Sequence, residues 1–416
     1  MRRLTVEEVR SVRRDPVDTT TLQRAAEIVE RVRTGGEPEL RALAEEFGDL
    51  QSDQPLILGR AELDRAANKV DTETLALLER TADRIAAFAD SQRRSVVDLK
   101  LSVPGGIAGH SIAPVERAGC YAPGGRYPLP SSVLMTGVTA RAAGVAEVLV
   151  ATPRPAALTL AAAAVAGADA VLAVGGAQAI AALAYGAGPV PACDVVVGPG
   201  NRWVTAAKKL VAGDVGIDML AGPSELVVLA DDGADPGTVA ADLLAQAEHD
   251  PDALPVLVTP SSTLADAVDT ELDRQLTELP TRVVAEAALD HGFTVVTANI
   301  SESIRVCNEL APEHLQVITD DAHAIAERLD HWGGLFIGAA SAEVFGDYGV
   351  GPNHTLPTGG VSRFTGGLSV LDFLRVRTWL KLEPDAEADA MVKDAAALAR
   401  LEGLEAHARA AERRMQ

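Results

Sequence analysis

Gln246 and His249 have side-chain types and a spacing that suit a metal site. They lie three residues apart in a segment that Asp235-Pro236 should open as a helix, so both face the same side of it. An amide oxygen and an imidazole nitrogen can both ligate a divalent cation, and one helix can supply two ligands at this spacing. A lone Q-x-x-H pair is more often the polar edge of a surface helix, so a metal site here requires ligands from other segments.

Glu313 and His314 are neighbours in the segment PEHLQV, between a proline and an apolar run. Neighbouring side chains diverge on a regular helix or strand, so the two can serve one site only if the turn holds them together. An imidazole is a suitable general base near neutral pH, and a carboxylate beside it can orient it or activate water. A solvated turn explains the pair equally well at this point.

The segment from Gly346 to Gly367 has the pattern of a long glycine-rich loop that carries Asp347 and His354. Loops of this length are usually functional or else disordered. The Asp347 carboxylate could ligate a metal ion, and His354 could bind a metal or a substrate from the same turn. Without partners elsewhere, an aspartate among glycines is more often part of an Asx-turn.

Glu402 and His407 lie in an Ala-, Glu- and Arg-rich tail, from Ala386 to Arg414, that has a helical pattern. On one continuous helix these two side chains point to different faces, so they converge only if Gly403 loosens the helix. Such a helix would be marginal in water by itself. We therefore expect the tail to pack on something, for example a second subunit.

Three glycine turns lie beside expected strands, although the chain has no G-x-G-x-x-G fingerprint of an ordinary Rossmann site. They are YAPGG, which begins at Tyr121, VGGAQ, which ends at Gln178, and GPGN, which ends at Asn201. In such turns backbone or amide groups can approach a nucleotide. Each turn taken singly also has an ordinary structural explanation.

The elements that must position these residues follow a regular order. From Thr20 to about Arg94 apolar residues recur three and four apart, which predicts helices, with Gly35-Gly36 closing the first. After Val103 short apolar runs alternate with helical stretches, in two arrays that join at about Asp218 to Ser224. This alternation predicts an α/β fold with two doubly wound parallel sheets. The expected strands are EVLVAT, AVLAVG, DVVVGPG, ELVVLAD, PVLVT, FTVVTA, LQVIT and GLFIGA.

Composition excludes several classes of protein. The 416 residues, 47% of them hydrophobic, can build two or three cores. A net charge of −22 would repel nucleic acid and anionic lipid, and 3% aromatic residues cannot form a base-stacking surface. The N-terminal segment lacks the apolar core of a secretory signal, and the alanine-rich region from Ala156 to Gly188 is too polar to span a membrane. We expect a cytoplasmic protein with reduced, buried cysteines.

Taken together, several of these segments occur in the order and approximate spacing of histidinol dehydrogenases. They are YAPGGRYPLPSSVLM, VGGAQAIAALAYG, GPGNRWV, IDMLAGPSE, DLLAQAEHD, PEHLQV, FGDYGVGPNHTLPTGG and EGLEAH. The chain thus resembles that family over nearly its whole length, most closely from Tyr121 to Leu368. The resemblance implies a homodimeric enzyme of histidine biosynthesis that oxidises L-histidinol through L-histidinal to L-histidine. It also implies two successive hydride transfers to NAD and one zinc ion per active site.

The resemblance implies two Rossmann-like domains without the glycine fingerprint, plus short helical arms that form the dimer. In this division residues 1–20 are an N-terminal helical arm, and 21–120 together with 223–369 form a first domain with the zinc and catalytic residues. Residues 121–222 form a second domain on the NAD side. The last segment, 370–416, is a C-terminal helical arm that reaches the other subunit.

Matched position by position, the resemblance implies a role for each candidate residue. The zinc ligands would be Gln246, His249 and Asp347, completed by His407 of the other subunit. Glu313 and His314 would be the acid/base pair.

Substrate and cofactor contacts are implied in the same way. The substrate would touch the zinc ligands and His314, and would be held by Ser224, His354 and Glu402. The NAD-contacting residues would be Tyr121, Gln178 and Asn201.

Three other functions stay open on the sequence. The nearest is another NAD-linked alcohol dehydrogenase on the same scaffold, whose substrate has no imidazole. A zinc hydrolase would use metal-activated water and need no nicotinamide. A binding protein without catalytic activity is disfavoured, because an acid/base pair stands beside a full ligand set.

Overall fold

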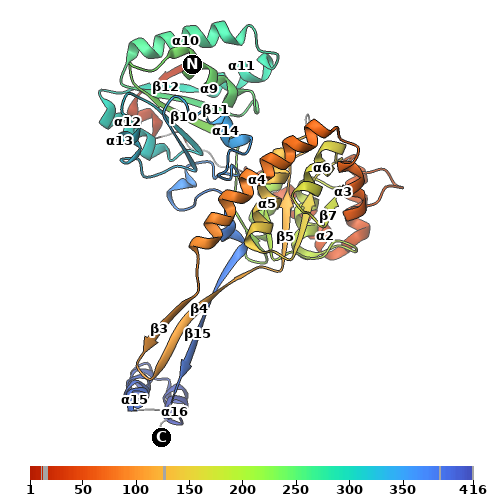
Figure 1. Ribbon diagram of the computed structural model, residues 1–416, viewed down its shortest axis with the longest axis vertical. Helices are drawn as coiled ribbons and strands as arrows, with labels where there is room; N and C mark the ends of the chain where they lie inside the picture. The colour runs from red at the N-terminus through yellow and green to blue at the C-terminus, as the bar shows by residue number, and fades with distance from the viewer. Residues whose placement is uncertain (11, 13–16, 125–127, 384–385, 415–416) are drawn as a thin grey trace.

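The computed structural model describes residues 1–10, 12, 17–124, 128–383 and 386–414. Two α/β lobes lie side by side, and a long arm extends from them and ends in a pair of helices (Figure 1). We name the lobes after a central strand of each sheet. The β5 lobe contains β5 (Arg117–Tyr121), and the β10 lobe contains β10 (Glu225–Ala230).

The sheet of the β5 lobe has six strands in the order β2-β7-β6-β5-β8-β9, and only the edge strand β2 is antiparallel. Besides β5 its strands are β2 (Ile57–Gly59), β6 (Glu147–Ala151), β7 (Ala170–Leu172), β8 (Val195–Val197) and β9 (Gly216–Ile217). One face is covered by α3 (Arg60–Ala67), α4 (Thr72–Ser95), α5 (Pro130–Ala143) and α6 (Ala157–Val165). The other is covered by α2 (Thr19–Glu46), α7 (Gly176–Tyr185) and α8 (Arg202–Val211).

The sheet of the β10 lobe is parallel throughout, in the order β1-β12-β11-β10-β13-β14. Its other strands are β1 (Arg2–Leu4), β11 (Leu254–Thr259), β12 (Phe293–Val296), β13 (His314–Ile318) and β14 (Gly334–Ile337). One face is covered by α9 (Pro236–Ala247), α10 (Ser262–Leu276) and α11 (Arg282–His291). The other is covered by α1 (Val6–Val9), α12 (Ile300–Leu310) and α13 (Ala322–Ala326). Both lobes are therefore doubly wound, as the alternating pattern predicts.

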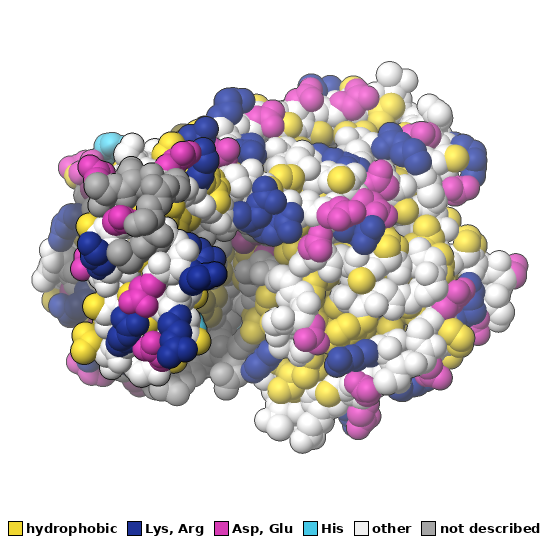
Figure 2. Space-filling view, turned by 90° about the horizontal axis from the view of Figure 1, so that it is seen from below, with side chains coloured by type: hydrophobic (Ala, Val, Ile, Leu, Met, Phe, Trp, Pro, Cys, Tyr) yellow, Lys and Arg dark blue, Asp and Glu magenta, His cyan; other side chains and the backbone are white. Residues whose placement is uncertain are grey.

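The arm is an antiparallel three-stranded sheet in the order β15-β4-β3, with two helices at its tip (Figure 1). Its elements are β3 (Leu99–Val103), β4 (Gly106–Pro114), β15 (Leu374–Leu382), α15 (Ala386–Leu401) and α16 (Glu405–Glu412). Gly403, with φ of +77°, separates the two helices, as the sequence had allowed. In the view from below, basic and acidic side chains are interspersed, and no large area carries a single sign of charge (Figure 2).

Most predicted elements are present, including all eight strands of the two arrays. The helical pattern from Thr20 to Arg94 forms α2, α3 and α4, and Gly36 interrupts α2 with φ of +61°. Strands β3, β4 and β15 were not predicted. The loop from Gly346 to Gly367 is largely irregular and contains only the end of α14 (Val344–Asp347) and the short 3₁₀ helix η1 (Val361–Arg363). A second 3₁₀ helix, η2 (Val370–Phe373), leads into β15.

The structure differs from the predicted division of the chain in two places. Residues 21–120 do not join 223–369: α2, α3 and α4 cover the β5 sheet, and β2 pairs with β7. Helical periodicity shows which face of a helix is buried but not which sheet buries it. The described residues of the segment 1–20 do not form a helical arm either, because β1 pairs with β12 at the edge of the β10 sheet and α1 has only four residues.

Candidate active site

The predicted acid/base pair, Glu313 and His314, lies where two neighbouring parallel strands begin. Glu313 directly precedes β13, His314 is its first residue, and Ser224 directly precedes the adjacent β10. The Ser224 hydroxyl donates to Glu313 Oε2 at 2.8 Å, and the backbone N–H of Glu225 donates to the same oxygen at 2.9 Å. The amino ends of β10 and β13 thus form one polar site.

Glu313 and His314 do share this site, which the sequence left open. Ala311 ends α12 in the left-handed conformation with φ of +47°, and Pro312 follows it. After this turn Glu313 Oε2 and His314 Nδ1 lie 3.6 Å apart. Glu313 stands just outside the strand, so the alternation of side chains along a strand does not separate the pair.

The environment of His314 suits a base that accepts a proton at one nitrogen. Its Nδ1 lies 2.9 Å from the backbone carbonyl of Glu225, which can only accept, so Nδ1 carries the hydrogen. Its Nε2 is buried and makes no hydrogen bond among the described residues. Burial first, and then the neighbouring His354, lowers the pKa of His314 to about 4. The ring is therefore neutral near neutral pH, with a free lone pair at Nε2.

Glu313 has the opposite shift. Burial raises the pKa of its carboxyl well above the ordinary value, against the hydrogen bonds from Glu225 and Ser224, which lower it. A carboxyl with a raised pKa changes protonation state closer to neutral pH, as an acid/base catalyst requires. The two neighbours therefore differ in the way expected of a pair with separate proton-transfer roles.

Gln246, His249 and Asp347 come together near this pair. Asp235 caps α9 by accepting from the Thr238 N–H, and the helix carries Gln246 in its last turn, with His249 just beyond its end. Gln246 Oε1 lies 3.5 Å from the Ser224 hydroxyl. His249 Nε2 lies 3.4 Å from Asp347 Oδ2.

The His249 and Asp347 pair has donor atoms suited to a cation. Burial lowers the pKa of His249, but the Asp347 carboxylate outweighs burial and raises it to about 9. Asp347 Oδ2 is buried and has no hydrogen bond among the described residues. An imidazole and a carboxylate that face each other, with the amide of Gln246 on the same helix end as His249, match the ligand types of a zinc or similar site.

His354 lies against His314. Their rings stack with centroids 4.6 Å apart, and His354 Nε2 lies 3.5 Å from Asp347 Oδ1. Gly346 makes room for this ring, because a Cβ at that position would lie 2.1 Å from His354 Nδ1. The glycine-rich loop thus brings both of its candidate residues, Asp347 and His354, to the site.

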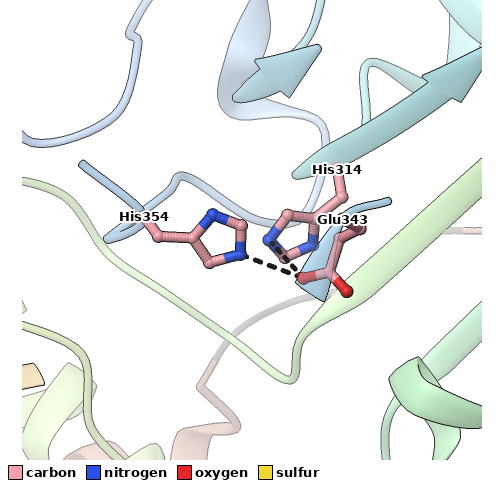
Figure 3. A group of neighbouring side chains, drawn as sticks. All are labelled: His314, Glu343 and His354. Atoms are coloured by element: carbon pink, nitrogen blue, oxygen red, sulfur yellow. Dashed lines mark hydrogen bonds and ion pairs between the residues drawn. The ribbon is translucent and has the colours of Figure 1, made fainter. Parts of the chain in front are cut away.

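Glu343 is a site residue that the sequence analysis missed. Its buried Oε1 lies 2.9 Å from His354 Nε2 and 3.5 Å from His314 Nε2, so one oxygen contacts both stacked rings at their edges (Figure 3). One possible ligand atom from each of these three side chains lies within 4.8 Å of the other two, close enough to hold a cation. Glu343 precedes Asp347 by four residues, a helical spacing that could have indicated it.

Glu402 and His407 do not reach this site within the chain. Both are exposed, at the end of α15 and in α16, at the tip of the arm (Figure 1). The structure therefore brings together Ser224, Gln246, His249, Glu313, His314, Asp347 and His354, and leaves Glu402 and His407 apart.

The three predicted NAD-contacting residues line one cavity in the β5 lobe. The cavity has a volume of about 600 Å³, and Tyr121, Gln178 and Asn201 are part of its wall. It opens at the carboxyl ends of β5, β6, β7 and β8, on both sides of the point where the strand order reverses. Ligands of open α/β sheets bind at this position.

The polar groups of this cavity are held by short hydrogen bonds. The buried Asp49 accepts from the Gly175 N–H at 2.9 Å and from Gln178 Nε2 at 3.2 Å. The Tyr121 hydroxyl accepts from the Gly176 N–H at 3.1 Å. Gly125, the last residue of the YAPGG turn, lies outside the described residues.

A buried ion pair supports the turn that carries Asn201. Lys208 on α8 binds the Asp218 carboxylate and donates to the Gly198 carbonyl at 3.0 Å, and Asp218 Oδ2 accepts from the Gly198 N–H at 2.8 Å. Both partners are fully buried, so breaking the pair would leave a charge without solvent. Asn201 itself caps α8 by accepting from the Trp203 N–H.

No helix in the described part of the chain is long and apolar enough to cross a membrane. The sequence profile of the family described as histidinol dehydrogenase matches residues 12–415.

Similar proteins of the same name span the chain at high identity. The histidinol dehydrogenase of Thermus thermophilus is 48% identical over 83% of both chains, and that of Natronomonas pharaonis is 46% identical over 93% of this chain and 92% of its own. The crystal structure of the histidinol dehydrogenase of Elizabethkingia anophelis superposes with a TM-score of 0.92 at 30% identity, covering 100% of this chain and 98% of the other. The chain therefore belongs to the histidinol dehydrogenase family.

Proposed function

We propose that this protein catalyses the NAD-linked, four-electron oxidation of L-histidinol, through L-histidinal, to L-histidine, the final steps of histidine biosynthesis. The observation that carries the proposal is the buried His314 beside Glu313: its Nδ1 contacts the Glu225 carbonyl, and its Nε2 makes no hydrogen bond among the described residues. We also place the protein in the cytoplasm, where its three buried cysteines would stay reduced.

The residues of the β10 lobe fit a zinc ion. Asp347 Oδ2 is buried without a hydrogen bond among the described residues and faces His249 Nε2, and Gln246 offers an amide oxygen nearby. These three residues would hold the ion, with His407 of a second copy as a further ligand. A bound zinc ion would supply positive charge that orients the amine and imidazole of the substrate.

In the first oxidation His314 accepts the proton of the substrate hydroxyl at Nε2. The backbone carbonyl of Glu225 fixes the tautomer at Nδ1, and Glu343 Oε1, 3.5 Å from Nε2, stabilises the imidazolium that forms. NAD, when bound, supplies the acceptor for the hydride that leaves the carbon bearing this hydroxyl. The alcohol thus loses two electrons and two hydrogens and becomes the aldehyde.

In the second oxidation Glu313 acts as the base that activates water. Addition of this water to the aldehyde gives a hydrate, whose carbon loses a hydride while its hydroxyl proton passes to a base of the site. Ser224 and the Glu225 N–H hold Glu313 Oε2 at 2.8 and 2.9 Å and keep the carboxylate directed at the site. Glu313 is therefore needed chiefly for the step that consumes the aldehyde.

Further residues would bind the substrate and the cofactor. Ser224 and His354 line the site from the chain itself, whereas Glu402 would come from the arm of a second copy. Tyr121, Gln178 and Asn201 would contact NAD in the cavity of the β5 lobe.

The arm supports a homodimer with shared sites. Residues paired across adjacent antiparallel strands point to the same face, so Leu101, Ala108 and Leu380 form one row. Leu101 is 59% exposed, Leu380 is 61% exposed and Val376 on the same face is 62% exposed. An uncovered apolar face of this kind marks an association surface. A second copy covering it would bring Glu402 and His407 to the site they cannot reach within one chain.

Mixed dimers test this sharing. Each variant alone, His407→Ala or Glu313→Gln, should be strongly impaired. In a mixed dimer both changes fall in one of the two sites, so the other site is intact and activity should partly recover on mixing and reassembly. Absence of recovery in dimers shown to be mixed would contradict the shared site.

The proposal is tested by adding L-histidinol and NAD to the purified protein and following NADH. We expect NADH with L-histidinol and with L-histidinal. Formation of NADH only with alcohols that lack an imidazole would favour a different dehydrogenase. A zinc hydrolase would form no NADH with any alcohol and would cleave an ester or amide instead.

A further inference from the structure

The glycine-rich loop that supplies Asp347 and His354 belongs to the β10 lobe by its position in the site, but helices of the β5 lobe hold it. It runs beside α4, at the boundary between the lobes (Figure 1). Two of its residues, Gly349 and Asn353, make hydrogen bonds to α4 and α5. Each lies within two residues of Asp347 or His354.

Asn353 connects the residue next to it, His354, to α5. Its Nδ2 donates to the backbone carbonyl of Met135 at 2.8 Å and to the Thr139 hydroxyl at 2.9 Å. Its Oδ1 accepts from the Thr355 N–H at 2.9 Å, which fixes the backbone on the other side of His354. One amide therefore sets the loop conformation around His354 and attaches it to the opposite lobe.

Arg84 on α4 performs the same function near Asp347. Its Nε donates to the Gly349 carbonyl at 2.7 Å, and its Nη2 donates to the Thr81 hydroxyl at 3.1 Å. Gly349 has φ of +72°, and a Cβ there would lie 2.5 Å from Thr81 Cγ2. The loop backbone thus packs directly on α4, at a distance that only glycine permits.

We infer that Asn353 and Arg84 are positioning residues through which α4 and α5 of the β5 lobe place His354 and Asp347. This inference rests on the proposed roles of these two residues in substrate and zinc binding. The lobe that would bind NAD then also determines how well the other lobe holds substrate and metal. If the two lobes moved apart, both His354 and Asp347 would lose the contacts that place them.

Positioning predicts a specific pattern of kinetic effects. A misplacement of about 1 Å in a site can cost on the order of a hundredfold in rate. Asn353→Ala should raise KM for L-histidinol and lower kcat/KM roughly tenfold to a hundredfold, while KM for NAD stays near the wild-type value. It should also speed the release of zinc from the purified protein to a chromogenic chelator, a measurement independent of activity.

Asn308 provides a matched control for loss of stability. It too makes hydrogen bonds between elements through both ends of its amide, donating to Asp330 Oδ2 at 3.2 Å and accepting from the Asp330 N–H at 2.8 Å, but none to a candidate site residue. Asn308→Ala should lower the unfolding temperature with no effect on zinc release or on KM. For Arg84→Ala the control on the same helix is Arg94→Ala, because the exposed Arg94 donates to Ser91 on its own helix and to no loop residue that the structure describes.

Thr139 allows the attachment to be broken from the other side. Thr139→Val removes the hydroxyl that Asn353 contacts, whereas Thr139→Ser keeps it. Thr139→Val should reproduce part of the Asn353→Ala effect, whereas Thr139→Ser should behave like the wild type. The double variant Thr139→Val with Asn353→Ala should be less impaired than the sum of the single effects predicts.

Two results would overturn the inference. One is that Asn353→Ala and Asn308→Ala show the same zinc release and the same KM for L-histidinol under conditions where their stability is equal. The other is full additivity of the Thr139 and Asn353 changes. The wild type serves as the reference for the proposed function: if it forms no NADH from L-histidinol, the function is wrong, whereas the zinc-release measurement still decides the positioning of the loop.

Discussion

The two lobes have the same architecture but carry their candidate sites at opposite edges of their sheets. In the β5 lobe the cavity lies at the carboxyl ends of the strands, beside Tyr121 and Asn201. In the β10 lobe Ser224, Glu313 and His314 lie at the amino ends of β10 and β13. Only the β5 lobe follows the usual rule for ligand binding in open α/β sheets.

The carboxyl edge of the β10 sheet shows one reason for the difference. There Asp231 directly follows β10 and Asp320 lies two residues after the end of β13, at the point where the strand order reverses. Asp231 Oδ2 accepts from the Asp320 N–H at 3.0 Å, so carboxylates occupy this edge and take up backbone donors. Such an edge repels the phosphates of a nucleotide. A shared fold therefore does not determine which edge binds a ligand; the residues at the strand ends do.

Zinc removal should give the largest difference in effect between the two lobes. Dialysis against a chelator should abolish turnover, because the donors Gln246, His249 and Asp347 lose the ion that orients the substrate. The circular dichroism spectrum and NAD binding should persist, because the β5 lobe has its own cores. Full activity in a sample shown to be free of metal would contradict the proposed site.

The substitution His314→Ala should impair both oxidations. Loss of a general base costs on the order of 10² to 10⁴ in rate. We expect kcat to fall by about this factor with either L-histidinol or L-histidinal, while NAD binding by the β5 lobe is unchanged. A mild loss, or a loss confined to one substrate, would remove His314 from its role as the base.

Glu313→Gln should affect the two steps unequally. The amide keeps the size of the side chain but cannot activate water, so oxidation of L-histidinal should be reduced more than oxidation of L-histidinol. Steady-state rates with each substrate measure this. Equal losses would show that Glu313 does not act selectively in the second step.

Asn201→Ala should affect the β5 lobe alone. We expect KM for NAD to rise roughly tenfold, the effect of about 1.4 kcal/mol of lost binding energy. KM for L-histidinol should stay unchanged, because the side chain lies in the cavity of the β5 lobe. Thermal unfolding is the control, because Asn201 also caps α8. A larger effect on L-histidinol than on NAD would show that this cavity is not the cofactor site.

The smallest expected effect concerns stability and pH in metal-free protein. The pKa of Glu313 is raised by burial, so its carboxyl favours the folded state below its unfolded pKa near 4.5, and this contribution is lost as the pH rises through the folded pKa. Glu313→Gln removes that loss, which amounts to about 1.4 kcal/mol per unit of pKa shift. Compared with the wild type, the variant should gain stability as the pH rises above the unfolded pKa, as measured by chemical denaturation. If the stability of the wild type and of Glu313→Gln changed with pH in parallel, the raised pKa of Glu313 would be contradicted.

The sequence predicted the elements of both sheets better than their assembly. Strands such as DVVVGPG are short apolar runs between turns, which local pattern reveals. The arm strands were missed, although β3 and β15 alternate apolar with polar residues, which is a strand pattern. Strand β4, which carries Gly106 and Gly109, departs from that pattern. That α2 to α4 cover the β5 sheet follows from tertiary packing, which periodicity does not encode.

The candidate site shows the same limit. Glu313, His314, Gln246 and His249 stand out by type and spacing, and the structure brings them together. Glu343 lies in none of the motifs, and its contact with His354 depends on a loop that Arg84 holds on α4 and that its own residue Asn353 attaches to α5. Contacts between segments far apart in the chain were beyond local sequence pattern.

The central claim, that one protein carries an alcohol all the way to the acid with the base of one lobe and the cofactor of the other, is tested by stoichiometry. L-Histidinol is supplied in limiting amount with excess NAD, and NADH and L-histidine are measured at completion. The account predicts two NADH and one L-histidine for each L-histidinol consumed. One NADH for each L-histidinol, with aldehyde accumulating in solution, would contradict it.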